Sequence, residues 1–243
     1  MTNNEWFCGI TSAPRKNPTL ASTVTSLQAA GFEPKVFAEP GTIVPTSAMG
    51  EIHKNRRGVW RNWVYTVTQA VRSEAEYVLI TQDDTSVHPD TQAVLDQLFE
   101  NPRYKVISTY TPRAYSHENQ KSTGRRNLPG VYPISSKTLW GAVGLAYRRE
   151  VLVDALNHDL IGTWRGVKPA RNPEEIVNSD VAIGRILYAA RVPVWFPTPS
   201  FGVHTSQYSS IPGHGSNDVR RNRNAEEPAN WNLPLWDQLF SSV

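Results

Sequence analysis

Short apolar runs alternate with longer segments of helical periodicity along most of this chain. The apolar runs predict strands at residues 6–10, 35–38, 77–80, 106–110, 141–147 and 192–196. Helices are predicted between them at residues 19–30, 59–71, 149–157 and 174–190, and a further helix is predicted with Pro89 and Asp90 in its first turn. Repeated strand–helix units of this kind predict an α/β fold with a mostly parallel central sheet and helices on both faces.

Changes in composition mark the loops and the end of the domain. Gly31 is placed to end the first helix, and the polar, basic residues 111–137 predict a long loop. After Phe201 the sequence turns to Ser, Gly, Asn, Pro and Arg, which predicts an extended segment. We therefore expect one domain over residues 1–205 and an extended C-terminal segment over residues 206–243 that packs on or near the active site.

The overall composition narrows the class of protein. Of the 243 residues, 39% are hydrophobic and 19% are charged, which supports a packed core and excludes a disordered chain. The one cysteine, Cys8, lies in an apolar run, so we expect a buried thiol without a redox role and a reducing compartment. No segment approaches the roughly 20 apolar residues of a membrane span, and the N-terminus lacks the pattern of a signal peptide. We expect a cytoplasmic protein with no membrane partner.

Positive charge is gathered in clusters although the net charge is only +3. The clusters lie at Lys54–Arg57, at Arg125–Arg126 and at Arg220–Arg223. Two interpretations stay open: the clusters are solvated loops, or they form a surface that binds a polyanion.

Two adjacent carboxylates, Asp83 and Asp84, follow the apolar run of residues 77–80. Neighbouring like charges repel, so a positive group is expected beside them. In parallel α/β sheets, ligands bind at the carboxyl ends of the strands, which is where this pair and the loop after the first strand both fall. We therefore expect the carboxylates to hold a cation that in turn holds a phosphate. The alternative is a strand-end pair that caps the following turn.

Five segments, taken in order, carry a resemblance to a known family. They are "GVWRNWVYTV" (58–67), "TQDD" (81–84), "LWGAVGLAYRREVL" (139–152), "NSD" (178–180) and "FGVH" (201–204). With these segments the chain resembles the GT-A fold nucleotide-sugar-dependent glycosyltransferases over roughly residues 5–205, with a Rossmann-like, GT-A-like catalytic domain as the implied fold. The "TQDD" segment is similar to their metal motif, "NSD" to their acidic catalytic motif, and "FGVH" supplies a late histidine.

The resemblance implies that a sugar moves from a nucleotide-diphosphate sugar, with a UDP-sugar favoured, to an acceptor hydroxyl, as in a hexosyl- or pentosyltransferase. It makes Asp84 and His204 ligands of Mn²⁺ or Mg²⁺ and places Asp83 and Gln82 near the nucleotide ribose. Such a cation prefers oxygen ligands and stabilises the charge of a departing diphosphate. Gln82 stands where the family usually has an acidic residue. Without the motif order, His204 would be interpreted as a surface residue.

Asp180 is the candidate catalytic base, because the attacking hydroxyl must lose a proton as the new bond forms. Its alternative role is a helix N-terminal charge favoured by the helix dipole. If Asp180 is the base, the anomeric carbon is inverted; if the anomer is retained, Asp180 positions a substrate instead.

Further residues are candidates for binding the nucleotide sugar. Thr11 and Arg15 lie on the first loop, and Arg61 lies on the helix before the metal motif, where the two arginines would bind phosphates or remain surface residues. Trp60, Trp63 and Trp140 are interpreted first as core residues. Trp140, beside Gly141, is the best candidate among them to line the donor sugar, since close backbone approach at the glycine would leave room for it.

Rival classes fit the sequence less well. A nucleotidyltransferase would be expected to carry a glycine-rich phosphate loop after the first strand, and "GITSAPRKN" lacks one. A phosphatase of the aspartyl-phosphate type needs aspartates two positions apart. A non-catalytic nucleic-acid-binding protein would explain the basic clusters but neither the "TQDD" segment nor the late histidine.

The basic clusters suggest a nucleic acid as acceptor, because phosphate contacts supply most non-specific affinity for DNA. Our hypothesis is a hydroxyl on a modified, hydroxymethylated base in DNA, by functional analogy with phage DNA-glucosylating enzymes. Reaching that hydroxyl in a duplex requires extruding the base, with Tyr110 and Tyr115 as expected stacking partners. The alternative acceptor is a hydroxyl on a glycan or a protein.

Overall fold

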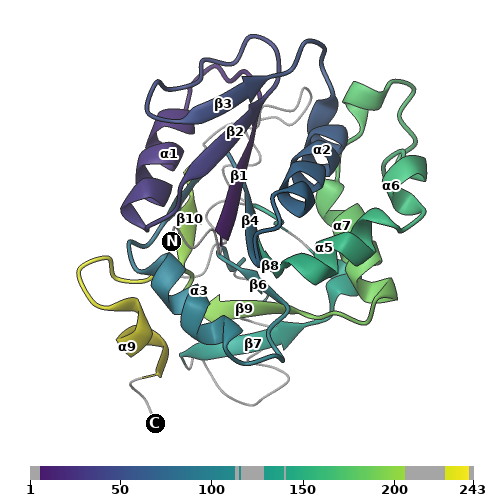
Figure 1. Ribbon diagram of the computed structural model, residues 1–243. Coiled ribbons are helices and arrows are strands. Elements are labelled where there is room, and N and C mark those ends of the chain that lie inside the picture. The colour runs from purple at the N-terminus through teal and green to yellow at the C-terminus, as the bar shows by residue number, and fades with distance from the viewer. Residues whose placement is uncertain (1–5, 113–114, 116–128, 140, 206–227, 241–243) are drawn as a thin grey trace.

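The computed structural model describes residues 6–112, 115, 129–139, 141–205 and 228–240. Its centre is an 8-stranded sheet in the order β3-β2-β1-β4-β8-β6-β9-β7 (Figure 1). The strands of this sheet are β1 (Trp6–Ser12), β2 (Pro34–Ala38), β3 (Met49–Ile52), β4 (Tyr77–Gln82), β6 (Val106–Ser108), β7 (Gly130–Ile134), β8 (Gly144–Arg148) and β9 (Val194–Thr198). A separate two-stranded sheet pairs β5 (Thr85–Val87) with β10 (Gly202–His204).

Most neighbouring strands run parallel, as the sequence predicted. Strands β3, β2, β1 and β4 pair in parallel, and so do β6 and β9. Strand β8 runs antiparallel between β4 and β6, and β7 runs antiparallel to β9 at the sheet edge. The carboxyl ends of β1, β4, β6 and β9 therefore meet the start of β8 at one edge of the sheet, which is called the site edge below.

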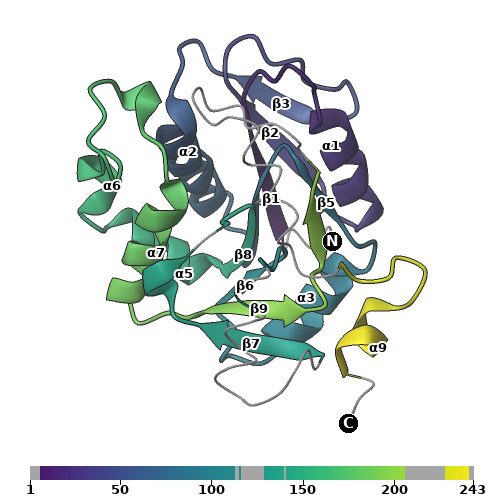
Figure 2. The ribbon, with the colours of Figure 1, turned by 180° about the vertical axis from the view of Figure 1, so that it is seen from behind.

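Helices cover both faces of the sheet (Figures 1 and 2). The helices are α1 (Leu20–Ala29), α2 (Gly58–Arg72), α3 (Thr91–Phe99), α5 (Arg149–Leu156), α6 (Leu160–Thr163), α7 (Ser179–Ala189) and α9 (Leu235–Phe240), with short 3₁₀ turns at η1 (Ser136–Thr138) and η2 (Pro173–Glu175). Helices α2, α5 and α7 pack on one face, whereas α1, α3 and α9 pack on the other. None of these helices is long and apolar enough to cross a membrane, among the residues that the structure describes.

The alternation of side chains along the central strands builds the two halves of the core. In β4, Val78 and Ile80 are buried with α2, α5 and α7, whereas Leu79 is buried with α1 and α3. Successive side chains of a strand point to opposite faces, so a strand covered on both faces is apolar at every position. Cys8 is buried in the α1 side of the core, and burial raises its pKa, as expected of an inert thiol.

Some predicted boundaries were wrong for identifiable reasons. The expected helix at residues 174–190 is split, because Asn178 adopts a left-handed conformation with φ of 60° and α7 begins only after it. Within the predicted loop 111–137, β7 is a strand; its Pro133 is tolerated because β7 lies at the sheet edge. Gly31, with φ of +95°, ends α1 as predicted.

The predicted C-terminal segment is described only in part, since residues 206–227 and 241–243 lie outside the described residues. Helix α9 contacts α3, and the backbone N–H of Leu235 donates to Asp90 at 3.0 Å. The imidazole of His88 lies 3.1 Å from the backbone oxygen of Leu233. These contacts fix residues 228–240 beside α3, and packing of residues 206–243 near the active site stays a prediction.

Candidate active site

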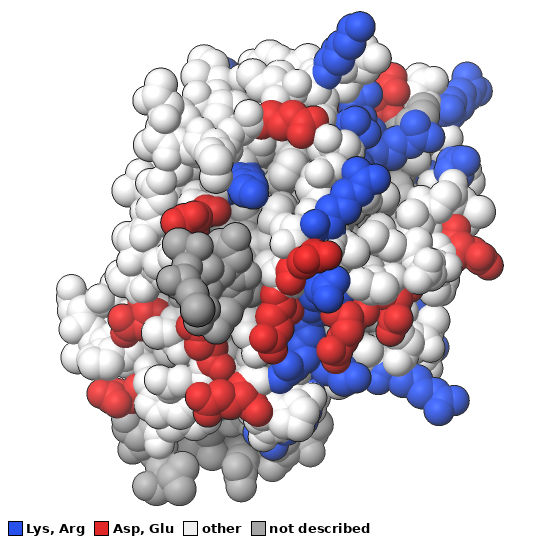
Figure 3. Space-filling view, viewed as in Figure 1, with Lys and Arg blue, Asp and Glu red and all other residues white. Residues whose placement is uncertain are grey.

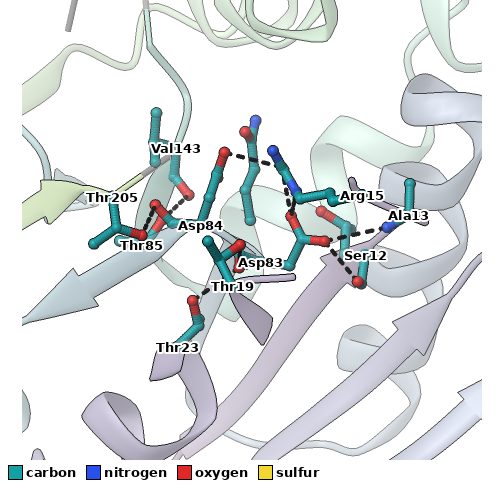
Figure 4. Close-up of polar contacts among 12 residues, drawn as sticks. Ser12, Ala13, Arg15, Thr19, Thr23, Asp83, Asp84, Thr85, Val143 and Thr205 are labelled. Carbon is teal, nitrogen blue, oxygen red and sulfur yellow. Dashed lines mark hydrogen bonds and ion pairs between the residues drawn. The ribbon is translucent and has the colours of Figure 1, made fainter. Parts of the chain in front are cut away.

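The register of β1 and β4 brings the first loop next to the aspartate pair (Figure 4). Thr11 lies opposite Gln82 in the parallel ladder, so residues 12–15 and Asp83–Asp84 leave the sheet side by side at the site edge. Gln82 is half-buried, and its backbone N–H donates to Val143 at 2.8 Å. The ends of the two strands thus bring the guanidinium of Arg15 to carboxylates that lie about 70 positions later in the sequence.

Asp83 is bound by the first loop. Its Oδ2 accepts hydrogen bonds from Ser12 Oγ at 2.6 Å and from the Ala13 backbone N–H at 3.3 Å. Its Oδ1 accepts from Nε and Nη2 of Arg15 at 2.8 and 2.5 Å. Burial raises the pKa of the Asp83 carboxyl, and Arg15 and Ser12 oppose that shift. Both oxygens therefore have partners within the protein, which makes Asp83 the anchor of the loop that carries Arg15.

Asp84 has a different set of partners. Its Oδ2 lies 2.9 Å from Arg15 Nη2 and 2.8 Å from His204 Nε2. His204 reaches this position because β10 pairs with β5, which places His204 opposite Thr85. Burial opposes ionisation of Asp84, but His204 and Arg15 outweigh burial and lower the pKa of this carboxyl. Asp84 is therefore a carboxylate at neutral pH.

Threonines fix the backbone of the aspartate pair, and the sequence did not single them out. The carbonyl oxygen of Asp83 accepts from Thr19 Oγ1 at 2.7 Å and Thr23 Oγ1 at 2.9 Å. The carbonyl oxygen of Asp84 accepts from the Thr205 N–H at 2.7 Å and its Oγ1 at 3.0 Å. Thr19, the N-cap of α1, and Thr23 lie four positions apart, so their side chains can reach the same carbonyl, but threonines at a helix start are too common to reveal this role.

Asp84 and His204 fit a divalent cation as a partial set of ligands. Oδ1 of Asp84 is buried and has no hydrogen-bond partner among the described residues. Within those same residues, no three His, Cys, Asp or Glu side chains gather into a complete metal site. Mg²⁺ commonly uses one or two carboxylates and takes its other ligands from phosphates and water. The donor set therefore suits a cation that binds together with a diphosphate, and metal ligation stays a prediction.

Asp180 and Gly141 lie next to each other at the site edge. Asp180 lies in the first turn of α7, and its Oδ1 accepts from the Val181 N–H at 2.9 Å. Its Oδ2 accepts a longer hydrogen bond from the Gly141 N–H at 3.4 Å. Burial raises the pKa of Asp180, and these backbone N–H groups oppose the shift only in part. A raised pKa suits a group that must accept a proton.

Tyr110 links the two halves of the site. A Cβ built on Gly141, whose φ is +70°, would lie 3.4 Å from Cε1 of Tyr110. The Tyr110 ring lies 6.2 Å from the His204 ring, measured between centroids. Asp84, His204, Tyr110, Gly141 and Asp180 therefore form a continuous row along the site edge, which the sequence order alone did not show.

Other expected residues lie elsewhere. Arg61 is exposed on α2, and its side chain takes part in no hydrogen bond or ion pair among the described residues. Trp140 lies outside the described residues. Tyr110 and Tyr115 are only 6% and 4% exposed, which contradicts the expectation that both stack on an extruded base. Tyr115 packs on Phe196 with ring centroids 4.6 Å apart, because the apolar body of the ring completes the core on the α2 side of the sheet.

Comparisons with known proteins give a likeness at the level of the fold. No family model matches the sequence, and no curated protein matches it. The crystal structure of S. aureus TarS 1–349 in complex with UDP-GlcNAc matches with a TM-score of 0.50 and 12% identity, covering 84% of this chain and 60% of that one. The crystal structure of S. aureus TarS 1–349 matches with a TM-score of 0.49 and 14% identity, covering 79% of this chain and 60% of that one.

This chain thus spans about 60% of the length of those solved structures. The likeness to the UDP-GlcNAc complex, together with the sheet order and its two helical layers, confirms the GT-A-like α/β fold that the sequence predicted.

Proposed function

We propose that this protein is a glycosyltransferase that moves a sugar from a nucleotide-diphosphate sugar to an acceptor hydroxyl. The observation that carries the proposal is the row of Asp84, His204, Tyr110, Gly141 and Asp180 along one edge of a GT-A-like sheet. A fold neighbour was crystallised with UDP-GlcNAc, which supports a UDP-sugar as donor. The identity of the nucleotide-sugar donor would establish whether the transferred sugar is a hexose or a pentose.

Asp180 is the proposed base. Its carboxylate accepts the proton of the attacking hydroxyl as the new glycosidic bond forms and the bond to the diphosphate breaks. A positioned base contributes about 10² to 10⁴ in rate, and it works best when its pKa lies near the working pH. The burial that raises the pKa of Asp180 moves it in that direction. This role gives an inverted anomeric carbon; in a retaining enzyme Asp180 would position a substrate.

Asp84 and His204 are proposed to hold Mn²⁺ or Mg²⁺. When bound, such a cation supplies positive charge that stabilises the departing diphosphate. The lowered pKa of Asp84 keeps this ligand ionised, and Thr205 holds its backbone in place. Asp83 orients Arg15, whose guanidinium can donate to phosphate oxygens.

DNA is the proposed acceptor, through a hydroxyl on a modified base. Cations gather where α2 begins: Lys54 and Arg56 are exposed, and Arg57 is half-buried over the ring of Tyr65. Gly58, the first residue of α2, is so close to Glu174 that a Cβ added to it would lie 2.6 Å from Glu174 Cα. This contact brings the segment of Lys168 and Arg171, also exposed, to the same side of the molecule. Lys54, Arg56, Arg57, Lys168 and Arg171 are called the basic surface below; Figure 3 shows Lys and Arg side chains gathering over this part.

The basic surface lies at the same edge of the sheet as the candidate active site. Glu39 directly follows β2, and its carboxylate accepts from the backbone N–H groups of Arg57 and Gly58 at 2.8 and 2.9 Å. The start of α2 is thereby tied to the carboxyl end of β2. The other basic clusters, at residues 125–126 and 220–223, lie outside the described residues. A glycan or protein hydroxyl is the alternative acceptor.

Donor binding tests the proposed function. We expect UDP-sugars such as UDP-GlcNAc and UDP-glucose to raise the melting temperature in the presence of Mn²⁺, since a ligand of the native state stabilises it. Slow release of UDP from the bound donor should depend on the metal. Asp84→Asn should lose at least about 100-fold in this rate while staying folded, whereas Asp154→Asn, an exposed carboxylate on α5, should behave as the unmodified protein.

Two results would contradict the proposal. One is a melting temperature that no nucleotide sugar changes. The other is near-normal, metal-dependent release of UDP by a folded Asp84→Asn variant. Release of pyrophosphate from a nucleoside triphosphate and a sugar phosphate would instead identify a nucleotidyltransferase.

A further inference from the structure

One guanidinium holds both aspartates, but it holds them unequally. Arg15 donates two hydrogen bonds to Asp83, from Nε at 2.8 Å and from Nη2 at 2.5 Å, whereas its Nη2 lies 2.9 Å from Oδ2 of Asp84 as an ion pair. The Arg15 side chain is only 10% exposed, and the aspartate side chains are 4% and 3% exposed. Arg15 is therefore built into the site edge and is not a mobile surface arginine.

The contact of Arg15 with Asp84 uses the carboxylate oxygen that also faces His204. Oδ2 of Asp84 carries both Arg15 and His204, while Oδ1 of the same carboxylate is buried with no partner among the described residues. A divalent cation between Asp84 and His204 would lie beside the charged Nη2 of Arg15. The divalent cation and the guanidinium of Arg15 are both positive, and two neighbouring positive charges repel strongly where water is excluded. Arg15 and a divalent cation thus compete for Asp84.

A diphosphate removes this competition, because it offers the guanidinium a new partner. Arginine binds phosphate through paired N–H groups. Nη2 of Arg15 can exchange its contacts with Asp83 and Asp84 for phosphate oxygens while Nε keeps its hydrogen bond to Asp83. Asp83 keeps Ser12 and the Ala13 N–H in either arrangement, so the loop holds its shape.

We propose that Arg15 is a positioning residue that couples binding of the divalent cation to binding of the nucleotide diphosphate. In the free protein Arg15 serves as the counter-charge of Asp84 and weakens metal binding. With the nucleotide bound, Arg15 donates to the diphosphate and releases Asp84. This inference rests on the proposed function, since it requires a site for both ligands.

Binding of Mn²⁺ measured by electron paramagnetic resonance, with and without UDP, tests the coupling without any turnover. In the unmodified protein, we expect saturating UDP to tighten Mn²⁺ binding at least about tenfold. UDP contributes phosphate ligands of its own, so the decisive comparison is made without UDP. There, Arg15→Gln should bind Mn²⁺ about tenfold more tightly than the unmodified protein, and should bind UDP alone about tenfold more weakly.

Lys16→Gln is the matched control, because Lys16 is exposed on the same loop and its substitution removes the same charge. We expect its Mn²⁺ affinity to stay within about twofold of the unmodified value, since exposed charges are screened. Arg15→Lys keeps the charge but cannot bridge two carboxylates with a planar guanidinium. Its affinity for Mn²⁺ without UDP should therefore lie between those of Arg15→Gln and Lys16→Gln.

The outcomes separate this inference from the proposed function. If UDP and Mn²⁺ both bind the unmodified protein, but Mn²⁺ alone binds Arg15→Gln no more tightly, Arg15 does not couple the two ligands. If neither ligand binds the unmodified protein, the proposed function fails as well. Should Arg15→Gln not fold, the unmodified protein still decides: equal Mn²⁺ affinity with and without UDP overturns the coupling.

Discussion

At the scale of single residues, the pKa values of Asp84 and Asp180 are shifted in opposite directions. His204 and Arg15 lower the pKa of Asp84, whereas burial raises the pKa of Asp180. Opposite shifts of this kind separate a permanently charged ligand from a group that exchanges protons. The two shifts support the proposed roles of Asp84 as a charged ligand and of Asp180 as the base.

Asp180→Asn should keep donor binding and lose about 10² to 10⁴ in kcat, because the amide preserves shape but cannot accept a proton. In the unmodified enzyme kcat/KM should rise with pH through the raised pKa of Asp180, since only the ionised form is a base. That limb should lie above the pH at which an ordinary aspartate titrates, 3.8.

A pH–rate profile of both proteins checks the assignment. The residual activity of Asp180→Asn should lack the rising limb. Equal losses in donor affinity and rate, with the limb retained, would indicate that Asp180 binds a substrate and is not the base.

At the scale of elements, the start of α2 depends on a close backbone contact. Gly58 has φ of +76°, and a Cβ there would lie 2.6 Å from Cα and 2.8 Å from the carbonyl oxygen of Glu174. The contact joins the first turn of α2 to η2, just ahead of α7, which carries Asp180. The position thus admits no side chain without movement of backbone.

Gly58→Ala should lower the free energy of unfolding by about 2–4 kcal/mol, from left-handed strain and overlap together. Gly162→Ala is the control, since nothing lies within 4 Å of a Cβ there and alanine favours the helix. Urea unfolding of the two variants measures the difference. A loss of stability in Gly58→Ala no larger than in Gly162→Ala would mean that η2 moves freely from α2.

Elements that bury continuous apolar runs could be predicted from the sequence, and others could not. Strand β4 and helix α2 have patterns that only one structure satisfies. Strand β10, of residues 202–204, is too short for a pattern and exists because β5 offers it a partner. Asn178 breaks the expected long helix through a conformation that its sequence neighbours do not reveal.

For the candidate site, the motif residues could be predicted from the sequence, whereas the contacts between them could not. Asp83, Asp84, Asp180 and His204 stood out as motif residues. Arg15, Gly141 and Tyr110 were also candidates, but their contacts could not be predicted. The contact of Arg15 with both aspartates and the place of Tyr110 between Gly141 and His204 arise from the way the strands pair.

At the scale of the whole molecule, the basic surface lies at the same edge of the sheet as the candidate site. The basic surface is tied to the site edge through Glu39, whereas Lys105 lies at the start of β6, at the opposite edge of the sheet. A polyanion attracted to the basic surface would therefore meet the molecule on the side of Asp84 and Asp180.

Affinity for duplex DNA at several salt concentrations tests this distribution. Between about 50 and 200 mM salt, affinity should fall steeply, and Arg56→Gln and Arg171→Gln should each reduce the slope of log K against log salt by about 0.9 per lost phosphate contact. Lys105→Gln, on the opposite edge, should leave the slope unchanged. Negligible binding, or binding that salt does not weaken, would exclude DNA and favour a glycan or protein acceptor.

The contact between Asp84 and His204 spans 120 positions of the chain. A ribosome adds about 5–20 residues per second, so His204 is synthesised on the order of ten seconds after Asp84. Arg15, made before both aspartates, is already present throughout that interval. Arg15 can therefore offset one of the two aspartate charges from the start, and His204 joins Asp84 later, when β10 pairs with β5.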